Sequence, residues 1–198
     1  MEFSYDSSNP THGIFWYLYN NQNIPYANAV FASSSSNHNE NALPHNAIDY
    51  YNNKYWLAEG NRPAGEYIAI TTFYVIKLKG YVIQTSDFGA DACHPRYWSF
   101  ATSSDGVKFN KNVSYKDTDG RMNNNLRHTY VPFTSDKVKY FRIYVTGLSY
   151  CNGYAFDLNQ VELFGTLYNV SDCFSDETCN RYHYKHFSSL ILLMIFFL

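Results

Sequence analysis

The feature that most constrains this chain is a succession of short apolar or alternating runs, separated by turn residues, with no long helical period between residues 13 and 168. Runs of this kind, rich in β-branched and aromatic residues, are typical of β-strands. The runs expected to form strands are residues 13–19, 27–32, 67–72, 73–78, 80–84, 98–102, 107–115, 129–133, 139–145 and 157–165. Several short strands at this spacing predict an all-β sandwich or barrel.

A hairpin signal and the composition support the same fold class. The Asp105-Gly106 step lies between two expected strands, and Asp-Gly is a strong indicator of a hairpin turn. The chain contains 20 Tyr and 15 Phe, and aromatic residues favour strands. A codon bias towards Tyr and Asn would give the same excess. The aromatic content therefore supports strands without deciding the function.

Length and charge exclude some classes of protein. At 198 residues and 45% hydrophobic content, the chain can form one domain with a sizeable core. Its 15 basic and 17 acidic side chains give a formal net charge of -2. A nucleic-acid-binding domain would show a basic excess, so we expect no nucleic-acid partner.

Catalytic motifs are missing from the sequence. It lacks the G-x-S-x-G elbow, the H-E-x-x-H pair, the G-x-G-x-x-G turn and the phosphate-binding loop. Cys93 and His94 are adjacent, and neighbours in an extended segment point to opposite faces, which argues against a nucleophile–base pair. Residues 117–120 match half of a calcium loop without its closing Glu, so a solvated turn is expected. We expect no enzyme activity and no cofactor.

The cysteines leave several pairings open. Cys93 and Cys151 each lie in an expected loop, and a disulfide would join them if those loops are neighbours. Cys173 and Cys179, with His183 and His186, would be a zinc set only at an unusually wide cysteine spacing. A local disulfide or two free thiols is the alternative for that pair. Asn112 and Asn169 lie in glycosylation sequons, which matter only if the chain is exported.

The two ends of the chain differ from the middle. We expect residues 1–12 to be an N-terminal extension without a secretory signal, and residues 169–189 to be a polar extension. Residues 190–198 are apolar throughout but fall short of the ~20 needed to span a bilayer. A weak membrane tether or a lipid-anchor signal would each account for this tail. The compartment stays undecided.

Residues 13–167 resemble the F5/8 type C domain, also called the discoidin domain. Six pieces in the family's order carry the resemblance: Ala32-Ser33-Ser34; His45-Asn46-Ala47-Ile48-Asp49 followed by Trp56; Gly65-Glu66-Tyr67-Ile68; His94 to Trp98 followed by Ser103-Ser104-Asp105-Gly106; Tyr140-Phe141-Arg142-Ile143; and Val161-Glu162-Leu163-Phe164-Gly165. The chain departs from the family pattern where Tyr67 and Phe109 replace tryptophans, and where Thr71 or Thr72 replaces an aspartate.

The resemblance implies a fold and a general role. The family's fold is a jelly-roll β-sandwich of about eight antiparallel strands, expected here over residues 13–168. Its members are mostly non-catalytic modules that bind glycans, anionic phospholipid headgroups or proteins through loops at one end of the barrel. Because one fold hosts many ligands, the ligand must be argued from the loops.

The loops expected at the binding end are residues 34–46, 50–55, 86–97 and 150–154. Their amides and imidazoles can pair with sugar hydroxyls, their aromatic rings offer flat apolar faces, and an arginine can hold an acidic group. The candidate ligand-binding residues are Asn37, His38, Asn39, Asn46, Tyr51, Tyr55, Phe88, His94, Arg96, Asn152 and Tyr154. For His94, loop packing is an equal alternative. We expect Trp56 and Trp98 in the core, and Arg142 as the structural partner of an acid.

These observations favour a carbohydrate ligand, with a protein or peptide second and a lipid headgroup third. Insertion into a lipid bilayer requires exposed apolar side chains at the loop tips, and Phe88 is the only clear candidate for such a side chain in the expected loops. An interaction domain working inside the cell is the main rival class. Reduced cysteines and unmodified Asn112 and Asn169 in the native protein would favour that rival.

Overall fold

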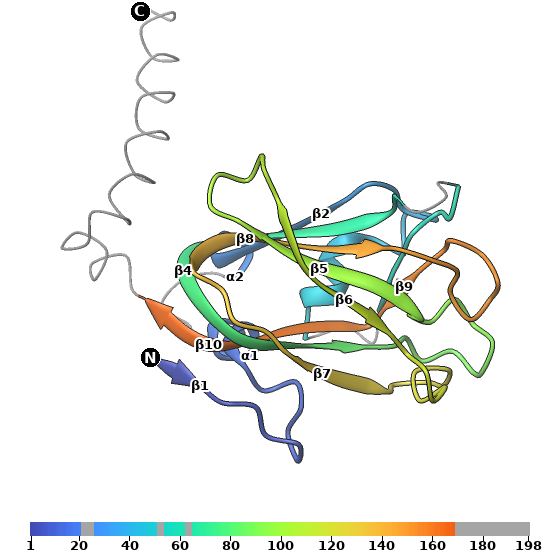
Figure 1. Cartoon of the computed structure of the whole chain (residues 1–198), viewed down its shortest axis with the longest axis horizontal. Coiled ribbons are helices and arrows are strands. Elements are labelled where there is room, and N and C mark those ends of the chain that lie inside the picture. The colour runs from blue at the N-terminus through green and yellow to red at the C-terminus, as the bar shows by residue number, and fades with distance from the viewer. Residues whose placement is uncertain (21–25, 51–53, 62–64, 169–198) are drawn as a thin grey trace, which may run out of the picture.

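The computed structural model describes residues 1–20, 26–50, 54–61 and 65–168, and these form a two-layered antiparallel jelly roll (Figure 1). The strands are β1 (Glu2–Phe3), β2 (Val30–Ser34), β3 (Trp56–Leu57), β4 (Tyr67–Gln84), β5 (Tyr97–Ser103), β6 (Asn110–Lys116), β7 (His128–Pro132), β8 (Lys137–Val145), β9 (Asp157–Leu158) and β10 (Gln160–Tyr168). The helices are α1 (Ile14–Asn20), α2 (Tyr26–Ala29) and the 3-10 turn η1 (Pro44–Ile48). The expected all-β jelly roll is therefore correct.

Strand β4 builds both layers. Its first part pairs with β2 and β8, while its second part pairs with β10 and β7. The register against β8 shifts between Thr71 and Ile76, where the strand passes from one layer to the other (Figure 1, left). The sequence indicated three separate runs here, but they form one long bent strand.

The outer strands complete the two layers. Strands β8, β5 and β6 follow β4 in the upper layer of Figure 1, and β10 continues to β1 in the other layer. Strands β3 and β9 form a separate two-stranded sheet. Strands β5 and β6 form a hairpin, as expected, with Gly106 at φ 73° in its connection.

The first expected strand is wrong, because residues 14–20 form helix α1. Its buried side chains are Ile14, Phe15 and Leu18, which share one helical face towards the core. Residues 26–29 are also helical, so the second expected strand begins only at Val30. Tertiary contacts override the β-propensity of the aromatic residues in residues 13–19.

The core between the layers is rich in aromatic residues. Trp56 and Trp98 are fully buried, as expected. The Trp98 indole Nε1 donates to the Tyr81 hydroxyl at 3.1 Å, which satisfies both polar atoms inside the core. The Tyr81 ring stacks on Phe100 with 4.1 Å between ring centroids. Within the described ranges, no helix is long and apolar enough to cross a membrane.

The interpretation of Arg142 as the partner of an acid is wrong for the part of the chain that the structure describes. The guanidinium carbon lies 3.9 Å from the Phe109 ring centroid and 4.2 Å from that of Tyr67. Its Nη1 donates to the Tyr144 hydroxyl at 3.1 Å. Aromatic rings, rather than a carboxylate, therefore hold this arginine in place.

Candidate functional site

Four connections gather at one end of the barrel: residues 35–43, 85–96, 117–127 and 146–156 (Figure 1, right). Backbone hydrogen bonds join residues 85–96 to residues 117–127 and to Asp157, which follows residues 146–156. Asp157 N donates to Cys93 O at 3.0 Å, Asp117 N donates to Arg96 O at 2.9 Å, and Leu126 N donates to Ser86 O at 3.0 Å. We call this surface the loop end. Three of its connections contain expected binding loops, and the fourth, residues 117–127, was not expected.

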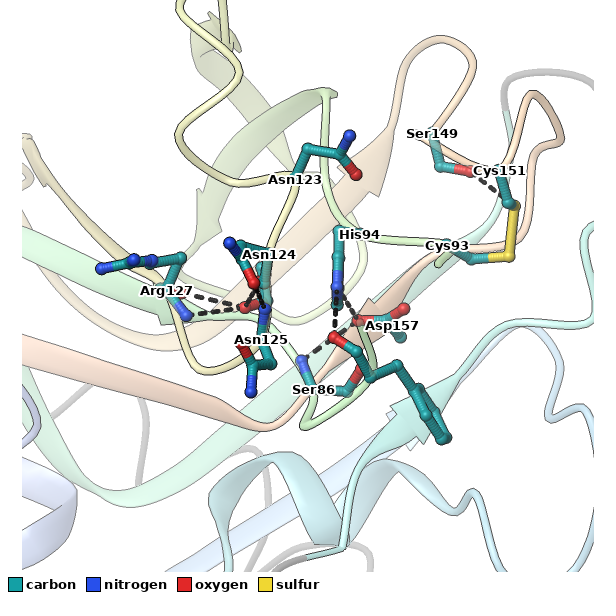
Figure 2. Close-up of polar contacts among 12 residues, drawn as sticks. Ser86, Cys93, His94, Asn123, Asn124, Asn125, Arg127, Ser149, Cys151 and Asp157 are labelled. Atoms are coloured by element: carbon teal, nitrogen blue, oxygen red, sulfur yellow. Dashed lines mark hydrogen bonds and ion pairs between the residues drawn. A yellow bond between two sulfur atoms is a disulfide. The ribbon is translucent and has the colours of Figure 1, made fainter. Parts of the chain in front are cut away.

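A disulfide staples two of these connections. Cys93 and Cys151, which are 58 residues apart in the chain, are bonded in the structure (Figure 2). The Ser149 hydroxyl lies 3.1 Å from the Cys151 sulfur. The disulfide was predicted only if the two loops are neighbours, and the structure places them side by side. The bond fixes residues 146–156 against residues 85–96.

His94 is buried and bonds to protein groups, which agrees with loop packing, the alternative to a ligand-binding role. Its ring has no exposed surface, and Nδ1 lies 3.0 Å from Asp157 Oδ1 (Figure 2). Nε2 lies 3.0 Å and 3.2 Å from the carbonyl oxygens of Phe88 and Gly89. Both ring nitrogens therefore face acceptors, which favours the doubly protonated imidazolium.

The electrostatics around His94 agree with that geometry. Burial on its own lowers the pKa of His94, but the hydrogen bond and charge of Asp157 raise it, as do the two carbonyls. The net pKa lies above the ordinary value of 6.5. Asp157 Oδ1 also accepts the Ser86 N–H at 3.2 Å. This buried pair ties the β4–β5 connection to β9.

Arg96 lies at the surface of the loop end between two tyrosines. Its guanidinium carbon is 5.4 Å from the ring centroids of both Tyr97 and Tyr150. The Tyr150 hydroxyl donates to Asp117 Oδ2 at 2.7 Å. Burial and this bond raise the pKa of Tyr150 above its usual range, so the phenol stays protonated. The half-buried Arg96 is thus held on aromatic faces with its fork of donors available.

Tyr55 and Phe88 form a second aromatic pair at this end. Their ring centroids lie 4.7 Å apart in an edge-to-face arrangement. The Phe88 side chain is 42% exposed, and Tyr55 is half-buried. The pair therefore presents apolar surface to solvent. The predicted binding residue Tyr51 lies outside the described residues.

The loop after β2 places three polar candidates in solvent. Asn37, His38 and Asn39 are all exposed. Asn39 Oδ1 accepts the backbone N–H of Asn41 at 2.8 Å, and Asn37 Oδ1 accepts the Ser34 hydroxyl at 2.6 Å. Each keeps donors for a ligand after these local bonds.

Asn46 is not a ligand-facing residue. Its side chain is 2% exposed, and its Nδ2 donates to Asn41 O at 2.8 Å and to Tyr55 O at 3.0 Å. It joins Asn41 to Tyr55, which lie on either side of η1 in the chain. At the other side of the loop end, Asn152 is exposed with φ 58°, and Tyr154 is half-buried.

Residues 117–127 are the part of the loop end that the sequence interpretation missed. Asn123 Oδ1 accepts the Asp91 N–H at 2.8 Å, and its Nδ2 donates to Asp91 Oδ1 at 3.1 Å. Asn125 Nδ2 donates to Asp87 Oδ1 at 3.2 Å. Figure 2 shows these asparagines beside the His94 pair. The signal in the sequence was the Asn run 123–125 between two expected strands.

The fold and its loop end define a jelly-roll β-sandwich domain with a rigid, polar and aromatic rim at one end. The family model of the F5/8 type C domain matches residues 31–156, and the chain belongs to this family. No curated protein matches the chain. In the described residues, no group of three or more His, Cys, Asp or Glu side chains could hold a metal ion.

Solved structures of carbohydrate-binding modules share the fold. The CBM32-5 module of a Clostridium perfringens family 89 glycoside hydrolase, in complex with GalNAc-β-1,3-galactose, is 16% identical with a TM-score of 0.58, over 68% of this chain and 94% of that one. The family 32 module of C. perfringens NanJ, in complex with galactose, is 14% identical with a TM-score of 0.56, over 68% and 93%. An F5/8 type C domain from Bacteroides fragilis is 14% identical with a TM-score of 0.55, over 70% and 92%.

Proposed function

We propose that this domain is a non-catalytic recognition module that binds a carbohydrate through its loop end. The observation that carries the proposal is the arrangement of Arg96 on Tyr97 and Tyr150 beside the disulfide-stapled loop. A sugar offers hydroxyls and flat C–H faces. Fixed guanidinium donors and half-exposed aromatic rings match both features.

Pre-organisation strengthens the proposal. The Cys93–Cys151 bond, the buried His94–Asp157 pair and the Asp91–Asn123 latch hold the loop end before any ligand arrives. Rigid loops lose less conformational entropy on binding, which favours affinity for small ligands. Modules of the same fold bind galactose and GalNAc-β-1,3-galactose, which places a neutral or amino sugar among the first ligands to test.

The non-catalytic part of the proposal rests on the pairing of the candidate groups. Cys93 is oxidised in a disulfide and cannot act as a nucleophile. His94 and Asp157 are side by side, but their side chains are 0% and 1% exposed. A substrate cannot reach this pair. Hydrolysis of an ester or glycoside panel that is abolished by His94→Gln would contradict this part.

A glycan-array screen with the full chain tests the binding proposal. The double variant Arg96→Ala/Tyr154→Ala removes one donor fork and one ring from the loop end, while Lys77→Ala changes an exposed residue on β4 away from it. We expect selective binding that the double variant loses and that Lys77→Ala keeps. Binding that survives the double variant would move the site elsewhere. Silence of a folded sample across the array would favour a protein-interaction domain.

The disulfide also supports work in an oxidising compartment, because such bonds persist mainly there. Titration of free thiols in the native protein, with mass analysis of Asn112, tests this part separately. Oxidised Cys93 and Cys151 with a glycan on Asn112 are expected. Reduced thiols and unmodified Asn112 would favour an interaction domain inside the cell.

A further inference from the structure

The outer face of one layer carries a second group of aromatic and basic residues. Strands β2, β4, β8, β5 and β6 form this layer, with Tyr67 opposite Tyr144 and Ala69 opposite Arg142 in register. Side chains alternate between faces along a strand. Since Ile68, Ile143 and Trp98 point into the core, Tyr67, Tyr144, Arg142 and Tyr97 point outwards.

Arg142 is held on this face by aromatic rings that surround its guanidinium group. Its guanidinium is 3.9 Å from the Phe109 ring centroid, 4.2 Å from that of Tyr67 and 5.5 Å from that of Tyr144. The Tyr144 hydroxyl accepts one of its five N–H donors, and no carboxylate pairs with it among the described residues. Its Nε is buried without a hydrogen-bond partner. The guanidinium is therefore oriented, and no counter-ion for its charge lies among residues 1–20, 26–50, 54–61 and 65–168.

A second cation continues the same surface towards the loop end. Lys116, opposite Tyr97 in register, places its Nζ 5.3 Å from the Tyr97 ring centroid. Lys116 is exposed, and Tyr97 and Tyr144 are half-buried. Ser99 and Ala101 lie on the same outer face opposite Tyr144 and Arg142, and they are only 1% and 0% exposed, so larger neighbouring side chains cover them.

The charge of this face contrasts with that of the chain. The outward positions on the five strands contain no Asp or Glu in the sequence, whereas the chain as a whole is net acidic at -2. The nearest carboxylate on the hairpin that carries Phe109 is Asp105. Its Oδ1 accepts the backbone N–H groups of Val107 and Lys108, both at 2.9 Å, which keeps it at the turn.

We propose that Tyr67, Tyr97, Phe109, Lys116, Arg142 and Tyr144, here called the sheet-face patch, bind an acidic polysaccharide through its carboxylate or sulfate groups. Arg142 supplies a pre-oriented fork that matches a planar or tetrahedral oxyanion, and Lys116 supplies a mobile point charge. The tyrosine faces between them suit sugar rings. A nucleic-acid backbone would need a longer row of cations than this patch offers. This surface adjoins the loop end at Tyr97, while Arg142, its main cation, lies outside the loop end.

Titration calorimetry with the full chain and three polysaccharides tests the inference. Dextran sulfate probes sulfate, polygalacturonate probes carboxylate, and dextran is the uncharged control. We expect one or both acidic polymers to bind and dextran to remain silent. Arg142→Gln should weaken binding by about tenfold or more, the usual effect of losing a charge-assisted hydrogen-bonded contact. Lys77→Gln, which removes an equal charge from β4 outside the patch, should leave it within about twofold.

Two further measurements keep the inference falsifiable. Because loss of the Arg142 clamp could unfold the sheet, thermal melting is recorded for each variant, and Lys116→Gln serves as the exposed substitution that leaves the fold intact. Absence of acidic-polymer binding, or equal weakening by Lys116→Gln and Lys77→Gln, would overturn the inference. So would equally tight binding of DNA. Binding of neutral glycans at the loop end should be unchanged by Arg142→Gln, so failure of either proposal is recognised separately.

Discussion

At the scale of single residues, His94 is the clearest example of a side chain whose role follows from its buried partners. Its pKa is raised above 6.5 in the folded state, so the native protein binds that proton more tightly than the unfolded chain does. The stabilisation from His94 is therefore complete below about pH 6.5 and is lost as the pH rises through the raised folded pKa.

We predict that His94→Gln lowers the free energy of unfolding by about 2–4 kcal/mol at pH 6, because it removes a buried pair and leaves Asp157 uncompensated. The difference from the wild type should shrink at pH 9. Urea unfolding of both proteins at the two pH values measures it. His45→Gln, at an exposed position, should change neither value. A pH-independent difference would show that His94 is neutral in the native state.

The residue scale also shows where sequence interpretation is limited. Trp56 and Trp98 were placed correctly in the core, because size and hydrophobicity alone favour burial. Asn46 and Arg142 were not, and His94 was left open between loop packing and ligand binding, because a polar side chain can be exposed, buried or stacked. Which of these occurs depends on partners distant in sequence, such as Asp157 for His94, 63 residues away.

At the scale of elements, the N-terminus of helix α1 depends on one buried carboxyl group from β10. Glu162 Oε1 accepts the N–H of Phe15 at 2.8 Å, and its Oε2 accepts that of Trp16 at 3.0 Å. The Tyr50 hydroxyl also donates to Oε2. Gly13 permits this approach, since a Cβ there would lie 2.4 Å from Leu163 O. Such a cap between distant segments explains why residues 13–19 were wrongly predicted as a strand.

We predict that Glu162→Gln destabilises the fold by about 1–3 kcal/mol. The NH2 group of the Gln amide is a hydrogen-bond donor, and it would face backbone N–H groups that need an acceptor. Burial raises the pKa of Glu162 to about 7, although hydrogen bonds from Tyr50, Phe15, Trp16 and Leu163 lower it. The wild type should therefore lose stability between pH 4.5 and about 7, and the variant should lack this component. Chemical unfolding across that range, with Glu40→Gln as the exposed control, checks both effects.

The disulfide is the second element-scale device, joining the β4–β5 and β8–β9 connections. Closing a loop of 58 residues is worth about 4 kcal/mol in the chain-entropy description. We predict that Cys93→Ser/Cys151→Ser lowers the free energy of unfolding by an amount of this order. It should also weaken glycan binding at the loop end in samples that are still folded. Unchanged glycan affinity in a folded double variant would show that the disulfide stabilises the fold without contributing to binding.

Strands and their order were the most predictable part of the fold, because apolar alternation and turn residues report on the local chain. The bend that makes residues 67–84 one strand was not predictable, since it depends on β8 shifting register. The loop end was predicted in outline from the family pattern. The contribution of residues 117–127 was missed, because their hydrogen bonds to Asp87 and Asp91 form only in the folded barrel.

At the scale of the whole molecule, the two proposed surfaces meet at Tyr97. Arg96 of the loop end lies 5.4 Å from its ring centroid, and Lys116 of the sheet-face patch lies 5.3 Å from it. Arg142 is opposite Ala101, four residues further along β5, which corresponds to about 14 Å at the usual strand rise. A single extended acidic glycan could therefore contact both surfaces at once.

We predict that affinity for acidic oligosaccharides rises in a step when the chain becomes long enough to span that distance of about 14 Å. Beyond this length one glycan chain can make both contacts. The second contact is then intramolecular and benefits from a high effective concentration. Arg142→Gln and Arg96→Gln should each remove the step, because either substitution leaves only one of the two surfaces to hold the chain. Calorimetry on a size-fractionated series measures both. A smooth increase with length that Arg142→Gln does not alter would mean that the two surfaces bind separate molecules, because only a bridging ligand couples Arg142 to chain length.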